Sequence, residues 1–272
     1  MSNSAIESVP SRRADLSNRP SRAVDRDEGP IERFEERATH WHPVAAVGSM
    51  AILGYAVMSA VLVGVGLLIT HQFGALTRWD ESVNRWFVAR RTPSWNDWTG
   101  YATRVADTLG ILVVLLLAAI ILFLLRHRWQ ALILLLALSL ELLTFLTVNY
   151  SVGRPRPDVK PLGSLPSTSS FPSGHTAATI ALYGGLALII SHRLRSRVAG
   201  FFLWTLAVLL ATAIGFARIY RGMHHPSDVI AGALMGLAAL GVAVVAVRIG
   251  QAAAERRRHP THRQTLDPEV AA

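Results

Sequence analysis

The stretch FPSGHTAATIALYGG, residues 171–185, joins a polar motif to the start of an apolar helix. The apolar part continues to about residue 191 and is a candidate membrane span, because about 20 residues cross roughly 30 Å of hydrocarbon. The polar part places Ser173, Gly174 and His175 at the mouth of that helix. A membrane helix that begins with a hydroxyl, a glycine and an imidazole predicts a polar site at the membrane surface.

Five further apolar segments surround this one, and a soluble domain would not contain such repeated runs. We therefore predict an all-α fold, a bundle of six transmembrane helices over residues 44–248. The polar residues 1–43 predict a disordered tail, and residues 249–272 a basic tail. The predicted spans, with ends known to roughly 2–4 residues, are 44–70, 108–125, 129–150, 174–191, 199–217 and 228–247.

The segment between the first two spans differs from both. It mixes aromatic residues with arginines, which favours an amphipathic helix lying at the membrane interface. An ordinary connecting loop is the alternative. The residues concerned, within 76–100, are Trp79, Trp86, Phe87, Trp95 and Trp98 together with Arg85, Arg90 and Arg91.

Basic residues exceed acidic ones by nine, and cysteine is absent. Without cysteine, disulfides and thiolate metal sites are excluded. Much of the basic excess flanks apolar runs, which indicates orientation in a membrane rather than nucleic-acid binding. By the positive-inside rule, these loops and both termini face the cytoplasm of a cell membrane. The arginines concerned are Arg126, Arg128, Arg193, Arg195, Arg197, Arg248 and Arg256–Arg258.

Two loops on the opposite, extracytoplasmic face are also basic, which topology does not explain. They contain Arg154 and Arg156, and Arg218 and Arg221. Guanidinium groups bind phosphate oxygens well, and helix N-termini such as that at Ser173 and Gly174 add N–H donors. We therefore predict an anion site on the outer face.

Three further residues of this face could perform chemistry on the anion. Asp228 follows His224 by four positions, so its carboxylate could orient the imidazole and leave the other nitrogen free to attack. His175, from another helix, could protonate the leaving oxygen. Each feature alone has a simpler reading: a solvated interfacial histidine, a helix-start hydrogen bond, or a metal-like pair of His224 with His225. Together they predict phosphoryl transfer.

These residues resemble the type-2 phosphatidic acid phosphatase family, a membrane branch of the superfamily that includes vanadium haloperoxidases and bacterial acid phosphatases. The family's motifs are Lys-x6-Arg-Pro, Pro-Ser-Gly-His and Ser-Arg-x5-His-x3-Asp. This chain has Arg156-Pro157, then Pro172 to His175, then Arg218, His224 and Asp228 at the same spacings.

The resemblance implies that His224 is the nucleophile, Asp228 its partner and His175 the general acid. It also implies that Arg156, Arg218, Ser173 and Gly174 bind phosphate and that neither a cofactor nor a metal is required. The implied substrate is a lipid phosphate such as phosphatidic acid, phosphatidylglycerol phosphate or a polyprenyl diphosphate.

The chain departs from the family pattern at two positions. Asn149 stands where the family has lysine, and Ala217 where it has serine. Asn149 can donate a hydrogen bond to phosphate but brings no charge, so Lys160 or Arg154 could supply the missing one, with Arg221 a further auxiliary residue. Two other functions are compatible with parts of this pattern: a vanadium haloperoxidase, disfavoured because those enzymes are generally soluble, and a non-catalytic lipid transporter or scaffold.

One acidic residue falls inside the third apolar segment. Glu141 is costly there unless it is paired or protonated. It could support an arginine or a substrate path, or it could be a structural residue bonded to another helix.

Overall fold

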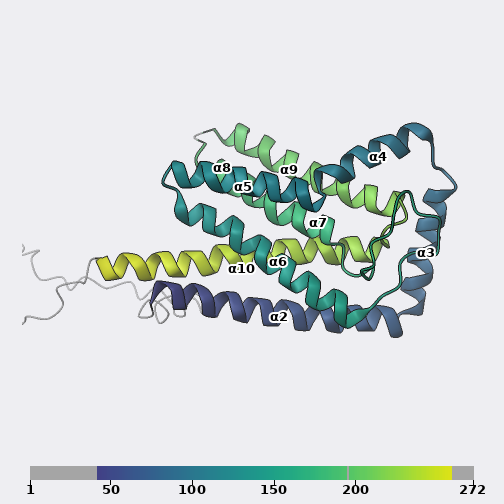
Figure 1. The fold of residues 1–272 in the computed structure, drawn as a ribbon, viewed down its shortest axis with the longest axis horizontal. Coiled ribbons are helices and arrows are strands. Elements are labelled where there is room, and N and C mark those ends of the chain that lie inside the picture. The colour runs from purple at the N-terminus through teal and green to yellow at the C-terminus, as the bar shows by residue number, and fades with distance from the viewer. Residues whose placement is uncertain (1–41, 195, 259–272) are drawn as a thin grey trace, which may run out of the picture.

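The chain is helical in the part that the computed structural model describes, residues 42–194 and 196–258. Those ranges contain no strand, which confirms the all-α prediction. Almost all of the predicted N-terminal tail, residues 1–43, lies outside them, as do residues 259–272. The elements (Figure 1) are α2 (Pro43–His71), α3 (Gly74–Val88), α4 (Pro93–Val105), α5 (Thr108–Leu124), α6 (Arg128–Val152), α7 (Gly174–Thr179), the π-helical turn η1 (Ile180–Gly184), α8 (Gly185–Ser191), α9 (Arg197–Tyr220) and α10 (Pro226–Arg258).

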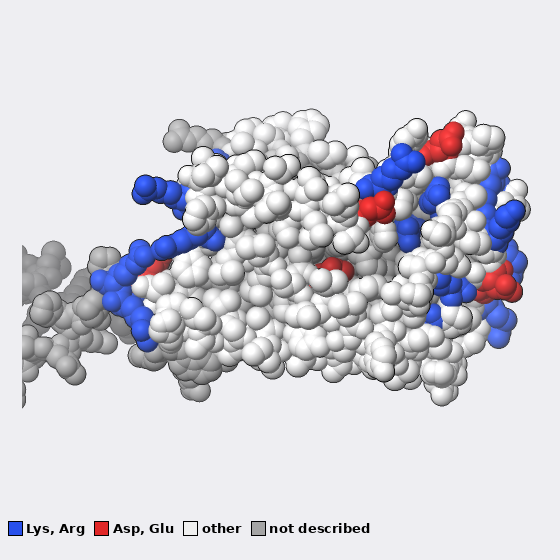
Figure 2. Space-filling view, in the orientation of Figure 1, with Lys and Arg blue, Asp and Glu red and all other residues white. Residues whose placement is uncertain are grey.

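Five of the described helical segments are long and apolar enough to cross a membrane, counting the run from α7 through η1 to α8 as one. A sixth span results if α4 and α5, which bend by 43° at their junction, are taken together. The surface in Figure 2 is white across its middle, apart from a few acidic atoms, and carries its charged residues at the two ends. The predicted multi-pass bundle is therefore confirmed.

Helix α10 is longer than predicted. Its 33 residues extend about 50 Å at 1.5 Å per residue, well beyond a hydrocarbon core of roughly 30 Å. The boundary expected between residues 248 and 249 falls inside this helix, because Ile249 is buried and packs against Ala46 of α2. The first ten residues of the predicted tail are thus helical.

The stretch predicted as one interfacial helix forms two, α3 and α4, because Pro93 begins a new helix that Thr92 caps. Figure 1 shows α3 lying across one end of the bundle, at a large angle to the long helices. Asp80 and Asn84, four residues apart and so on one face of α3, are completely buried against the bundle. Helix α3 therefore supplies polar groups to the end of the bundle that it covers.

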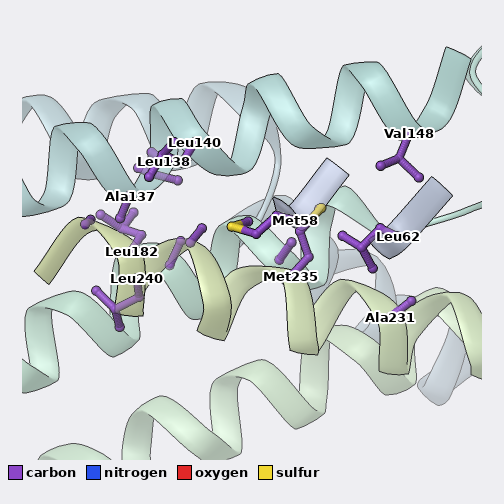
Figure 3. Packing of buried hydrophobic residues seen from close by; sticks show 14 of the residues in the cluster. Met58, Leu62, Ala137, Leu138, Leu140, Val148, Leu182, Ala231, Met235 and Leu240 are labelled. Atoms are coloured by element: carbon purple, nitrogen blue, oxygen red, sulfur yellow. The ribbon is translucent and has the colours of Figure 1, made fainter. Parts of the chain in front are cut away.

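The core of the bundle lies between α2, α6, α10 and η1. Met58 of α2, Leu138 of α6, Leu182 of η1 and Met235 of α10 belong to one buried cluster, and Figure 3 shows their side chains meeting between the helices. This packing fixes α6 and α10. The segments that contain the candidate site adjoin the C-terminal end of α6 and the N-terminal end of α10.

Two glycines on α10 allow that helix to approach α7 closely. A Cβ atom at Gly232 would overlap the carbonyl oxygen of Ser173, and one at Gly236 would lie 2.5 Å from that of Ala177. Small residues four apart commonly bring membrane helices together in this way. The contact places the start of α10, with Asp228, beside the start of α7.

Candidate active site

The end of the bundle where α6 ends and α10 begins contains a cavity of about 270 Å³. Its polar end is lined by Arg156, His175, Arg218 and His224, and the rest of its wall is mainly apolar side chains of α5 and α6. Side chains from three distant parts of the sequence thus converge, as predicted, on one space.

His224 lies in the short turn between α9 and α10 and is 3% exposed. Its Nδ1 is 2.7 Å from the carbonyl oxygen of Ser170. A carbonyl only accepts hydrogen bonds, so Nδ1 carries the proton and Nε2 keeps its lone pair. Burial lowers the pKa of His224 to about 4, so the ring is neutral at pH 7. A neutral imidazole with a free Nε2 is chemically able to attack phosphorus.

The direct hydrogen bond predicted between Asp228 and His224 is not made, since Oδ2 and Nδ1 are 3.8 Å apart, too far for a hydrogen bond. Asp228 instead accepts a hydrogen bond from the hydroxyl of Ser170, whose carbonyl oxygen holds His224. It also accepts from the backbone N–H of His225 at 2.8 Å. The carboxylate therefore positions His224 through the two segments that flank the ring.

Arg154 is buried between two carboxylates. Its guanidinium donates to Asp228 Oδ1 at 2.5 Å and to Asp80 Oδ2 at 2.7 Å, and Ser227 Oγ accepts a further bond at 2.7 Å. Both carboxylates are fully buried. Arg154 balances their charge and does not line the cavity, so the auxiliary phosphate role considered for it is not supported.

Arg156 and Arg218 line the cavity without an ion-pair partner in the described part of the chain. Arg156 is held by neutral acceptors: the carbonyl oxygen of Met223 at 2.6 Å and Thr168 through both its carbonyl and its hydroxyl oxygen. Partial burial lowers the pKa of Arg156. Arg218 is 4% exposed, and its Nε–H has no partner among the described residues. Two guanidinium groups that lack a counter-anion form a binding site for one.

Asn149 does not line this cavity. Its amide instead bonds the loop before α7, donating to the carbonyl oxygen of Ser169 at 3.0 Å and accepting from the N–H of Ser169 at 3.1 Å. The hydrogen bonds of the Asn149 amide are thus made to the protein, and the phosphate contact predicted for it stays a prediction. Its side chain holds the loop that carries Ser170 and the Pro-Ser-Gly-His motif.

Ser173 and Gly174 begin α7 as predicted. The Ser173 hydroxyl is completely buried and bonds Thr176 at 3.0 Å, while its N–H donates to the carbonyl oxygen of Asp228 at 3.0 Å. Gly174 lines the cavity. Gly174 is therefore the one of the two whose backbone borders the space where an anion would bind.

Lys160 and Arg221, the other two residues predicted as auxiliary phosphate ligands, do not line the cavity. Lys160 is exposed, and its carbonyl oxygen accepts from Arg91 at 2.6 Å. Arg221 donates to the carbonyl oxygens of Asn96 at 3.0 Å and Leu162 at 2.5 Å, and so ties α4 to the α6–α7 loop. Both contacts are structural.

Three carboxylates at the site were not predicted. Asp107, at the start of α5, lies 3.2 Å from His175 Nε2. Asp80 pairs with Arg154, and Glu81 lies 3.1 Å from His225 Nε2. A signal for Asp107 existed, since it immediately precedes a predicted outer-face helix start. Asp80 and Glu81 carry no comparable signal, because their segment is dominated by aromatic residues and arginines.

Comparison with known proteins yields a consistent set of matches. Residues 130–250 match the model of the PAP2 superfamily. Phosphatidylglycerophosphatase B of Bacillus subtilis (strain 168) is 27% identical over 159 residues, 58% of this chain and 78% of that protein. The undecaprenyl-diphosphatase of Sulfolobus acidocaldarius is 35% identical over 71 residues, 26% of this chain and 30% of that one.

Among solved structures, a transmembrane PAP2 type phosphatidylglycerolphosphate phosphatase from Bacillus subtilis superimposes with a TM-score of 0.60 at 24% identity. The match covers 75% of this chain and 94% of that one. At this identity the match shows a shared fold.

Proposed function

Because residues 130–250 of this chain match the PAP2 superfamily, we propose that the chain is a membrane lipid phosphatase of this superfamily and that its cavity hydrolyses lipid phosphates through a phosphohistidine on His224. The observation that carries the proposal is the pair Arg156 and Arg218. Both are cations without an acidic partner in the described residues, and both line the cavity that also contains His224. A phosphoryl group would supply the missing negative charge.

The first half-reaction uses the two histidines. The lone pair of His224 Nε2 attacks phosphorus, and the bond from phosphorus to the leaving oxygen breaks. His175, in the same cavity, gives its proton to that oxygen, which leaves as an alcohol or a phosphate. Arg156, Arg218 and the N–H groups at Gly174 stabilise the charge on the equatorial oxygens.

In the second half-reaction water attacks the phosphohistidine. His175, now neutral, removes a proton from the water, and the P–N bond breaks to release phosphate and regenerate His224 Nε2. Asp107 supports both steps, since its carboxylate stabilises positive charge on the His175 ring. We further propose that no metal is needed, because arginines supply the positive charge; activity that persists in a chelator would support this.

The cavity combines a polar end with an apolar wall. Below its polar end the wall is formed by Ile111, Leu112 and Leu115 of α5 and by Leu142 and Phe145 of α6. A headgroup at the arginines can therefore keep its hydrocarbon tails in an apolar space. The opposite end of the bundle carries the basic loops, including Arg126 and Arg193. By the positive-inside rule we propose that the cavity faces the extracytoplasmic side.

The test is phosphate release by the purified full-length chain from phosphatidic acid, phosphatidylglycerol phosphate and a polyprenyl diphosphate. We expect release from at least one, with none above background for His224→Ala or His224→Asn. Acid-labile labelling of the protein by a phosphorus-labelled substrate should disappear in the same variants. Wild-type rates in His224→Asn would overturn the mechanism, and lipid binding without phosphate release would favour a transporter or scaffold.

A further inference from the structure

Glu141 lies in the middle of the span α6 and is only 5% exposed. Its carboxyl group forms no hydrogen bond or ion pair with any residue in the ranges 42–194 and 196–258. A buried, unpartnered carboxyl group in hydrocarbon is costly and usually serves a function. The catalytic cycle proposed above does not use it.

The side chain lines the same cavity as the two histidines. Its position along α6 relative to the anion site follows from Phe145, whose ring would lie 3.1 Å from a Cβ atom at Gly174. Glu141 precedes Phe145 by four residues, which is about 6 Å along a helix. Glu141 therefore lies about one helical turn deeper than the start of α7, among Leu138, Leu142 and Ile111.

A group at this depth meets the part of a lipid just below its phosphate. In apolar surroundings a neutral carboxyl group is less costly than a charged one, and it offers one O–H donor. An acylated glycerol phosphate has ester carbonyl oxygens a few bonds from phosphorus, which accept hydrogen bonds. A polyprenyl diphosphate carries its second phosphate next to the reacting phosphorus, and beyond that phosphate it has only hydrocarbon and no carbonyl acceptor.

We propose that Glu141 determines substrate class by donating a hydrogen bond to an ester carbonyl of an acylated glycerol phosphate, so that the cavity prefers this class to polyprenyl diphosphates. The inference rests on the proposed function, because it assumes that a lipid phosphate occupies the cavity. It assigns a partner to an otherwise unpaired acid, and it explains why one polar group lines an apolar wall.

The experiment compares kcat/KM for three substrates: a diacyl glycerol phosphate, its diether analogue of equal chain length, and a polyprenyl diphosphate. The wild-type chain should favour the diacyl over the diether compound by roughly 2- to 12-fold, the range for one net hydrogen bond. Glu141→Leu should remove this preference for the diacyl compound without lowering kcat/KM for the polyprenyl diphosphate. Glu141→Gln replaces the O–H donor with an N–H donor and should retain part of the preference for the diacyl compound. Leu142→Ala, on the same wall, controls for cavity shape and should change all three substrates alike.

Two results would overturn the inference. One is equal wild-type activity on the diacyl and diether substrates, which requires no variant and so no assumption about folding. The other is an equal loss on all three substrates in Glu141→Leu. If the wild-type chain released phosphate from none of the three substrates, the proposed function would be overturned together with the inference. The two results above are seen only in a chain that does release phosphate, so they overturn the inference alone.

Discussion

Replacing Arg154 with methionine would leave two buried carboxylates without their cation. Arg154 donates to Asp80 and Asp228 at 2.7 and 2.5 Å, and its side chain is 2% exposed while both partners are completely buried. Methionine has a similar length, so the substitution removes charge and hydrogen bonds with little change in volume.

Removing one partner of a buried ion pair typically costs about 3–5 kcal/mol, because the remaining charge stays desolvated. For a domain of about 200 residues, 1 kcal/mol shifts Tm by roughly 2–4 °C. Arg154→Met should therefore lower the Tm by about 6–20 °C. The measurement is thermal unfolding of the full-length chain in detergent.

Arg156→Met is the matched control, since Arg156 lies two residues away and bonds only neutral acceptors. We expect a Tm within a few degrees of wild type but a kcat/KM at least tenfold lower, the cost of losing one charge-assisted contact of roughly 1.5–3 kcal/mol. The reverse pattern, with Arg154→Met stable but weak in substrate binding, would refute the assignment of the two arginines.

Three further outcomes follow from the site. The rate should fall as pH drops through about 4, because protonation of His224 removes the attacking lone pair, and an activity that keeps rising in acid would contradict its role. Asp107→Asn should lower kcat by up to about fivefold, the value of a partly exposed ion pair, and move the alkaline limb of the pH–rate profile to lower pH, because the amide no longer stabilises charge on His175. An unchanged profile would make the Asp107 contact incidental. Asn149→Lys should cost about 2 kcal/mol of unfolding free energy through two lost bonds to Ser169, whereas a lower KM at unchanged stability would return this position to phosphate binding.

The membrane helices could be predicted from the sequence because hydrophobic length is a local property. Each predicted span corresponds to an observed helical segment, with ends that differ by a few residues except in α10. The convergence of the three polar segments also followed from topology, since alternate loops of a bundle emerge on the same face. The composition of α10 beyond residue 248, rich in alanine and arginine, carried no apolar signal for its continuation against α2.

The partner of each polar side chain could not be predicted in this way. Arg154 and Arg156 have the same chemistry and stand two residues apart, so no sequence rule separates a structural arginine from one that lines the cavity. Likewise, His224 and Asp228 have the spacing for a direct contact, but Ser170 intervenes.

The apolar runs and the motif spacings by themselves determined that this chain is a helical membrane protein with an anion site at one end. Only the tertiary structure decided which charges neutralise one another and which remain available to a ligand. The physical reason is that hydrophobic burial depends on the composition of a segment, whereas ion pairs and hydrogen bonds depend on a few ångströms between residues far apart in the chain.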